Sequence, residues 1–167
     1  MILIGISGKK QAGKNTVATI LAQKLGKQCV EYAFADALKL EVAQACKVSV
    51  AEIEMHKETY RPLLQAWGSL RRTKNVDYFT EIVVRKILAQ KPEVAILTDV
   101  RYLNEAECVR KAGGYLIRVA RSTAVDDTHE SETSLDHFTE WDGLILNTGS
   151  MVHLKVEVDD TIRKLKL

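Results

Sequence analysis

The chain has 167 residues, of which 46% are hydrophobic and 28% charged, and its formal net charge is +2. This length and composition predict one globular domain with a substantial core, and they exclude disordered and collagen-like classes. The small net charge argues against a protein that coats nucleic acid or binds membranes through a polybasic surface.

The first predicted elements are a strand, a glycine-bounded loop and a helix, together spanning residues 2–25. Apolar side chains fill the strand, and others recur at helical spacing after the loop. Between them, Gly8, four further residues, Gly13 and Lys14 match the phosphate-binding P-loop. In such a loop, backbone N–H groups and the helix dipole hold phosphate oxygens, and the lysine adds a mobile charge. The stretch therefore predicts a nucleoside triphosphate site.

The rest of the chain alternates between apolar strands and amphipathic helices. Strands are predicted at residues 29–34, 94–97, 115–120 and 143–146. Helices are predicted from Asp36 to residue 45 and at residues 59–72, 77–90, 104–112 and 150–165. Pro62 is expected in the first turn of the helix at 59–72. The segment 122–140 lacks periodicity and holds six acidic residues but no Lys or Arg. Loops of this length are usually functional, so we expect a lid. The alternation predicts a three-layer α/β P-loop NTPase fold with a mostly parallel sheet of about five strands.

Three cysteines without a CxxC pair indicate a reduced, cytoplasmic protein. We expect no signal peptide, because the N-terminus leads straight into a strand. We also expect no membrane span, because no apolar run approaches the necessary ~20 residues.

Polar residues follow the predicted strands, at the sheet edge where ligands bind in this fold class. Asp99 ends an apolar strand, so it could hold Mg²⁺ as a Walker B carboxylate does, or cap the following helix. Arg101 could bind a phosphate in bidentate fashion or pair with Glu105 on the next turn. Asp36 and Asn147 occupy similar positions after the second and last strands.

A group of polar and basic residues surrounds the helix predicted at 59–72. Its members are Arg61, Gln65, Gly68, Ser69, Arg71 and Arg72. Such donors suit a second phosphate opposite the P-loop, although Arg71 and Arg72 could equally belong to a solvated basic helix. Arg121 leaves the fourth strand where the lid would begin, and could bridge two phosphates. In the acidic segment, His129, Ser131 and Glu132 could form a small polar network.

With these motifs the chain resembles the bacteriophage deoxynucleoside monophosphate kinases, a branch of the nucleoside monophosphate kinase-like P-loop fold. The matching stretches are GKKQAGKNT at 8–16, FADALK at 34–39, RPLLQAWGSLRR at 61–72, TDVRYLNEAE at 98–107, HESE at 129–132 and LNTGS at 146–150. Their combination is far more specific than a P-loop alone. The resemblance implies transfer of the ATP γ-phosphoryl group to a deoxynucleoside 5′-monophosphate, with Mg²⁺.

The resemblance also implies roles for individual residues. Those for ATP are Lys9, Gly13, Lys14, Asn15 and Thr16; those for the acceptor are Arg61, Gln65, Gly68, Ser69, Phe79, Asp99, Arg101 and Glu105. From the residues themselves we add Gly8 and Asn147 for ATP, and Asp36 and Arg72 for the acceptor. Catalysis would fall to Lys14, Arg101 and Arg121, and the metal to Asn15, Thr16 or Asp99. Phe79 could be an aromatic platform for the base or one more core residue. Asn147 could contact adenine or belong to a turn before a helix cap at Ser150.

We expect a single kinase domain over residues 1–167, with a monophosphate-binding insertion at about 36–90 and a lid at about 121–140. Its partners would be small nucleotides rather than nucleic-acid polymers or membranes, in a bacterial host's cytoplasm if the source is a phage. A homodimer stays open. The alternatives are a phosphomevalonate kinase-like enzyme or another small-molecule P-loop kinase, and, from a different class, a non-catalytic ATP-binding switch. A nucleic-acid 5′-end kinase is disfavoured by the near-neutral charge.

Overall fold

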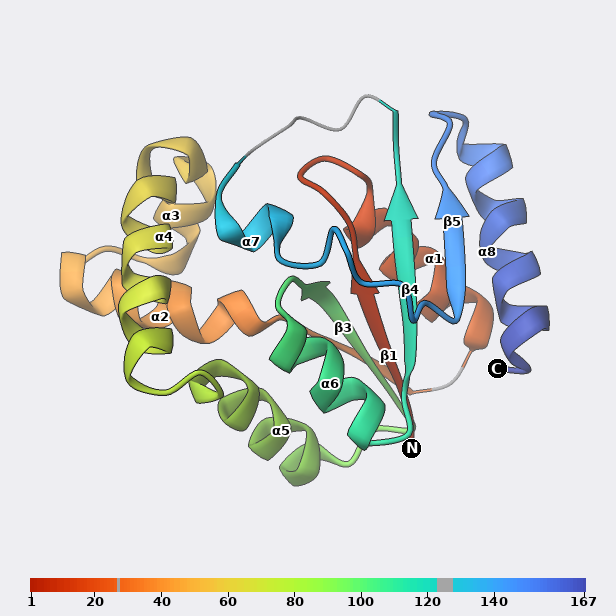
Figure 1. Ribbon diagram of the computed structural model, residues 1–167, viewed down its shortest axis with the longest axis horizontal. Helices are drawn as coiled ribbons and strands as arrows, with labels where there is room; N and C mark the ends of the chain where they lie inside the picture. The colour runs from red at the N-terminus through yellow and green to blue at the C-terminus, as the bar shows by residue number, and fades with distance from the viewer. Residues whose placement is uncertain (27, 123–127) are drawn as a thin grey trace.

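A computed structural model describes residues 1–26, 28–122 and 128–167, and its centre is a five-stranded parallel sheet. The strands are β1 (Ile2–Ser7), β2 (Cys29–Tyr32), β3 (Val94–Val100), β4 (Tyr115–Ala120) and β5 (Gly143–Leu146). They lie in the order β2–β3–β1–β4–β5, and every neighbouring pair is parallel (Figure 1). The predicted α/β class and strand number are confirmed.

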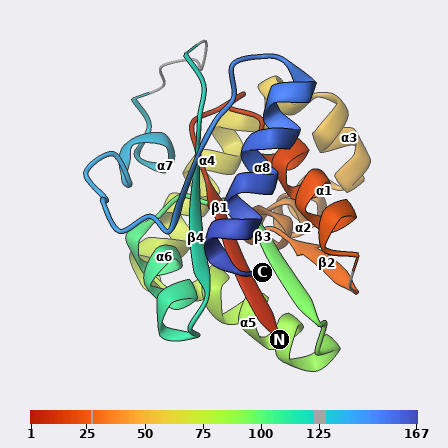
Figure 2. The ribbon, with the colours of Figure 1, turned by 90° about the vertical axis from the view of Figure 1, so that its right-hand side faces the viewer.

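Helices cover both faces of this sheet. They are α1 (Lys14–Leu25), α2 (Phe34–Cys46), α3 (Val50–Met55), α4 (Lys57–Lys74), α5 (Tyr78–Gln90), α6 (Leu103–Lys111), α7 (Glu130–Thr133) and α8 (Met151–Leu165). Helices α1 and α8 pack on one face and α5 and α6 on the other (Figure 2). Helices α2, α3 and α4 extend beyond the sheet, at the left of Figure 1.

The central strand β1 explains how the two core layers arise. Side chains alternate across a strand, so Ile4 and Ile6 enter the cluster beneath α1 and α8, whereas Leu3 enters the cluster beneath α5 and α6. All three are nearly inaccessible to solvent. A strand buried on both faces needs apolar residues at successive positions, which is why β1 and β3 read as continuous apolar runs.

The extension formed by α2, α3 and α4 has its own small core and one polar hub. The half-buried carboxylate of Glu41 in α2 accepts hydrogen bonds from Trp67 Nε1 (2.8 Å) and Arg71 Nε (2.7 Å) of α4, and from the hydroxyl of Tyr78 in α5. The Glu41 side chain therefore connects α2, α4 and α5. Arg71 is therefore engaged in this hub rather than held ready for a phosphate.

Two helix starts differ from the predictions. Asp36 does not cap α2, because that helix begins at Phe34 and Asp36 lies in its first turn. Pro62 does not lie in the first turn of its helix, because α4 already begins at Lys57. Within the described ranges, none of the helices combines the length and apolar character that a membrane crossing requires.

Candidate active site

The loop between β1 and α1 has a backbone that depends on its two glycines. A Cβ atom at Gly8 would lie 2.5 Å from the carbonyl oxygen of Val119 in β4. Gly13, just before α1, has a φ of +99°, in the left-handed region that favours glycine. Residues 13–16 then line a cavity with the first turn of the helix. Unpaired N–H groups at such a turn are suited to binding phosphate.

Asn147 supports this loop from the end of β5. Its Nδ2 donates to the carbonyl oxygen of Ala12 at 2.9 Å, and a Cβ atom at Gly13 would lie 2.5 Å from the same nitrogen. The residue is only 7% exposed, and its Oδ1 accepts from the Gly149 amide at 3.1 Å. Asn147 therefore holds the P-loop and forms the turn that precedes α8, as the second of its two predicted roles required, and its contact with adenine stays a prediction.

Lys14 is partly buried beneath the loop. Its Nζ donates to the carbonyl oxygens of Gly8 at 2.7 Å and Lys9 at 2.9 Å. Burial, with a smaller contribution from the charge of Arg101, lowers the pKa of Lys14 from 10.5 to about 8. The side chain of Lys9 pairs with Asp136 at 2.7 Å.

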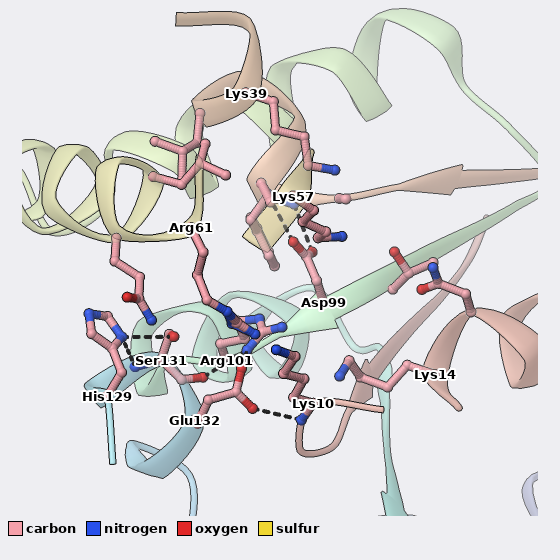
Figure 3. A pocket seen from close by; sticks show the side chains of 18 of the residues that line it. Lys10, Lys14, Lys39, Lys57, Arg61, Asp99, Arg101, His129, Ser131 and Glu132 are labelled. Atoms are coloured by element: carbon pink, nitrogen blue, oxygen red, sulfur yellow. Dashed lines mark hydrogen bonds and ion pairs between the residues drawn. The ribbon is translucent and has the colours of Figure 1, made fainter. Parts of the chain in front are cut away.

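The cavity beside the loop has a volume of about 560 Å³ and is bounded by the P-loop, α2, α4, the end of β3 and residues 129–132 (Figure 3). This volume lies within the ~300–1,000 Å³ typical of small-molecule sites. The predicted residues that line it are Gly13, Lys14, Asn15, Thr16, Arg61, Gln65, Arg72, Asp99, Arg101 and Glu105. The structure thus brings together residues from three separate motifs.

Other predicted residues lie elsewhere. The described residues that line the cavity do not include Gly8, Lys9, Asp36, Gly68, Ser69, Phe79, Arg121 or Asn147. The aromatic-platform interpretation of Phe79 is corrected, because its side chain is 2% exposed and belongs to the core beneath α5 and α6. Arg121 is exposed just beyond β4. Residues 123–127 of the predicted lid lie outside the described residues.

Asp99 contacts the start of helix α2, a contact that was not predicted from the sequence. Its two carboxylate oxygens accept hydrogen bonds from the backbone amides of Phe34 (2.8 Å) and Ala35 (2.9 Å). It therefore caps α2, not the helix after β3, and stabilises the positive N-terminus of α2. A carboxylate has further acceptor positions, so this role leaves room for another ligand.

The residues expected at a magnesium ion fit that ion chemically. Asn15, Thr16 and Asp99 all line the cavity and all offer oxygen donors. Among the described residues no cluster of three His, Cys, Asp or Glu side chains forms a metal cage. Mg²⁺ usually takes one or two protein oxygens together with substrate phosphates, so these residues would be sufficient to hold it.

Arg101 and Glu132 join the end of β3 to the acidic segment. The guanidinium of Arg101 contacts the Glu132 carboxylate and donates to the carbonyl oxygen of Ser131 at 3.2 Å. Burial would lower the pKa of Arg101, but the charges of Glu132 and Asp99 outweigh burial and raise it. The expected side-chain pairing with Glu105 is corrected, because Glu105 accepts from the backbone amide of Arg101 instead, at 2.7 Å.

Arg72 is fixed by α6 as much as by its own helix. Its guanidinium carbon lies 3.9 Å from the centre of the Tyr102 ring, and its Nη2 lies 3.3 Å from Glu105 Oε1. The Glu105 side chain is 2% exposed. Burial, reinforced by the charge of Asp99, raises the pKa of Glu105 from 4.5 to about 7. Arg72 thus reaches the cavity with little freedom to turn.

The expected network of His129, Ser131 and Glu132 is partly confirmed. His129 Nδ1 lies 2.9 Å from Ser131 Oγ and accepts from the Ser131 amide at 3.1 Å, while Glu132 turns toward Arg101 (Figure 3). Sequence reasoning missed Lys10, whose backbone amide donates to Glu132 at 2.8 Å. No local pattern marks that contact.

Arg118 was also missed, although the sequence carries a signal. It is a charged residue inside the otherwise apolar strand β4, and its Nη1 donates to Ser7 Oγ at 3.0 Å. Its other terminal nitrogen lies 3.6 Å from Asp136, and its guanidinium faces the Trp141 ring at 5.4 Å. Arg118 therefore links the end of β1 to the acidic segment.

Known sequences similar to this chain are kinases. The model of the phosphomevalonate kinase family matches residues 6–114. A protein of Acanthamoeba polyphaga mimivirus, provisionally named a deoxynucleotide monophosphate kinase, is 32% identical over 88% of this chain and 89% of its own length. A phosphomevalonate kinase of Drosophila melanogaster is 25% identical over 68% of this chain and 62% of its own.

Solved structures of P-loop kinases share the fold. Shikimate kinase from Bacteroides thetaiotaomicron superposes with a TM-score of 0.50 and 13% identity, over 99% of each chain. A gluconokinase from Sinorhizobium meliloti gives 0.52 and 13% identity, over 98% of this chain and 93% of the other. At these identities the likeness concerns the fold alone, and it confirms the predicted three-layer P-loop architecture.

Proposed function

Because the chain belongs to the deoxynucleotide monophosphate kinase family of its mimivirus relative, and also matches the phosphomevalonate kinase family model, we propose that it phosphorylates a deoxynucleoside 5′-monophosphate with ATP. Membership of this family makes it a P-loop kinase of small molecules. The identity of the acceptor is the proposal.

The observation that carries this proposal is the convergence of three arginines on the cavity of the P-loop. Arg61, Arg72 and Arg101 line the same cavity as Lys14. The P-loop lysine serves the phosphates of a triphosphate. Guanidinium groups bind phosphate through paired, charge-assisted hydrogen bonds, so three of them suit a second phosphate group. An acceptor that offers only a neutral alcohol would gain little from them.

The remaining wall of the cavity suits a nucleoside. The apolar side chains of Phe34, Leu38 and Leu64 line it, together with the amide of Gln65. An apolar surface with a few polar groups is typical of sites for flat heterocycles, since the amide can read the edge of a base. Gln65 and Arg61 are four residues apart on α4, so base and phosphate contacts would come from one helix face.

Phosphomevalonate remains the second candidate because the family model carries its name. That acceptor has a carboxylate as well as a phosphate, so it needs a further cation. Lys39 and Lys57 line the cavity, but both pair with the Glu54 carboxylate, Lys57 at 3.3 Å. Lys39 and Lys57 are therefore the groups that could supply this cation, and the panel of acceptors described below separates the two candidates.

The chemistry then needs positioning and charge rather than a base. An acceptor phosphate oxygen is already anionic, so no proton has to be removed from it. Arg61, Arg72 and Arg101 would hold that phosphate in line with the γ-phosphorus. Lys14 and Arg101, which lie near each other, would neutralise charge on the transferring group. Magnesium, when held near Asn15, Thr16 and Asp99, supplies further neutralisation of the triphosphate.

A panel of acceptors tests the proposal. ADP release from ATP would be measured with dTMP, dGMP, dCMP, dAMP, GMP and phosphomevalonate, with Lys14→Ala as the inactive control. We expect turnover with at least one deoxynucleotide and a far lower kcat/KM with phosphomevalonate. The reverse order would assign the chain to the second candidate. ATP binding without transfer to any acceptor would favour a nucleotide-binding switch.

A further inference from the structure

The carboxylate of Glu132 occupies a position that is built for an anion. One oxygen accepts from the backbone N–H of Lys10 in the P-loop at 2.8 Å, and the other contacts the guanidinium of Arg101. The Glu132 side chain is 1% exposed and lines the cavity beside Arg101 and Lys10 (Figure 3).

Both donors are groups that a phosphorylated substrate requires. A P-loop amide and an arginine at the end of the neighbouring strand are the donor types that hold phosphoryl oxygens. The Lys14 ammonium lies close enough for the charges of Arg101 and Glu132 to shift its pKa. A buried carboxylate and a phosphate cannot share these donors, because like charges at such a distance repel strongly.

Asp136 provides a second attachment of the same segment. It pairs with Lys9 of the P-loop at 2.7 Å and lies 3.6 Å from Arg118 in β4. Its side chain is more exposed than that of Glu132, and neither of its partners lines the cavity. The segment can therefore stay attached through Asp136 while Glu132 moves.

We infer that the position of the Glu132 carboxylate is a phosphoryl subsite, formed by the Lys10 N–H and Arg101. Glu132 competes with a substrate phosphate for these two donors. Phosphate binding expels the carboxylate and loosens residues 128–132 from the P-loop. The inference requires only that the P-loop binds a polyphosphate. It goes beyond the proposed function and does not depend on which acceptor the enzyme uses.

The first test is affinity for inorganic tripolyphosphate, measured by titration calorimetry without any acceptor. Glu132→Gln keeps the shape of the side chain but removes the competing charge, so its Kd should be about tenfold lower than that of the unmodified protein. Glu130→Gln is the matched control, since Glu130 lies exposed in the same short helix; its Kd should not change. An equal or weaker affinity of Glu132→Gln than of the unmodified protein overturns the inference.

The second test uses the unmodified protein, in case the variant does not fold. Hydrogen–deuterium exchange would be followed with and without tripolyphosphate. Peptides from residues 128–136 should exchange faster with tripolyphosphate, while peptides from residues 8–16 should exchange more slowly. A carboxylate that merely positions Arg101 would stay in place, so unchanged or slower exchange in 128–136 rejects competition. The acceptor panel is a separate readout, so failure of one proposal is distinguishable from failure of the other.

Discussion

The guanidinium of Arg72 is stacked on the ring of Tyr102, with 3.9 Å between the guanidinium carbon and the ring centre. A second ring, that of Phe79, lies 4.8 Å away, and Glu105 accepts from Arg72 at 3.3 Å. A planar cation held by two rings and a carboxylate has lost most of its freedom before any ligand arrives. Ordering that precedes binding lowers the cost of binding, so Arg72 is preorganised to receive an anion.

Replacing Arg72 by lysine should test this arrangement. Lysine keeps the charge but cannot stack as a plane or offer a paired donor, and cation–π contacts at desolvated sites contribute roughly 2 kcal/mol. We expect the KM for the acceptor to rise about tenfold, while the KM for ATP changes little. Arg71→Lys is the control, because Arg71 pairs with Glu41 away from the cavity. A proportional rise in both KM values would place Arg72 on the donor side.

The sheet and the P-loop could be predicted because their signals are local. Continuous apolar runs marked the buried strands, and two glycines followed by Lys14 marked the turn into α1. Contacts between residues far apart in the chain could not be predicted from the sequence. Lys10 and Glu132 are 122 positions apart, and neither residue type implies the other.

The errors in the site have a common physical reason. Phe79 lies in the correct segment, but the direction in which a side chain faces depends on how helices and strands pack. An amphipathic helix has one apolar stripe, and a sequence cannot show whether an aromatic residue on it faces the core or a cavity. The arginines of the site were easier to predict from the sequence, because a buried guanidinium needs an anionic partner and so indicates a polar site.

Lys14→Ala should abolish phosphoryl transfer and leave the fold intact. Among the described residues, the ammonium donates to two carbonyl oxygens of its own loop, so the protein loses little packing with it. Transition-state charge on the transferring group would then lose its nearest mobile cation. The measurement is ADP release alongside circular dichroism, with Lys24→Ala as a surface control on the same helix. Near-normal turnover of Lys14→Ala would remove the P-loop from the mechanism.

ATP binding should take up protons above neutral pH. With a pKa of about 8, a substantial fraction of Lys14 is neutral at pH 8.5 before ATP binds. The phosphates favour the charged form and raise that pKa, so binding is accompanied by protonation and weakens as the pH rises above 8. Calorimetry at pH 8.5 in buffers of different ionisation enthalpy would measure the uptake, which should be absent in Lys14→Met. Equal uptake in both proteins would assign the proton to another group.

Glu105 should make the protein less stable as the pH rises toward neutrality. Its pKa is about 7 in the folded protein and near 4.5 when unfolded, so the folded state binds more protons between these values. The stabilisation is present in full below pH 4.5 and is lost as the pH rises through 7, by at most about 3 kcal/mol. Glu105→Gln cannot titrate. Urea unfolding at pH 5, 6 and 7.5 should show the stability of the unmodified protein falling relative to this variant, and parallel curves would contradict the assignment.

Gly68→Ala should separate stability from acceptor binding. Gly68 lies inside α4, where alanine is favoured over glycine by about 1 kcal/mol. An added Cβ atom would lie 3.0 Å from Arg72 Nη1 and 3.5 Å from Leu38 Cδ2, so the guanidinium must move by a few tenths of an ångström. That displacement disturbs the stacking of Arg72 on Tyr102, and the gain in helix propensity offsets the stability lost with that contact. We therefore expect an unchanged or higher Tm together with a several-fold higher acceptor KM.

Thr73→Ala, an exposed change on the same helix, should raise helix propensity without altering KM. If Gly68→Ala binds the acceptor normally, the orientation of Arg72 does not control acceptor affinity.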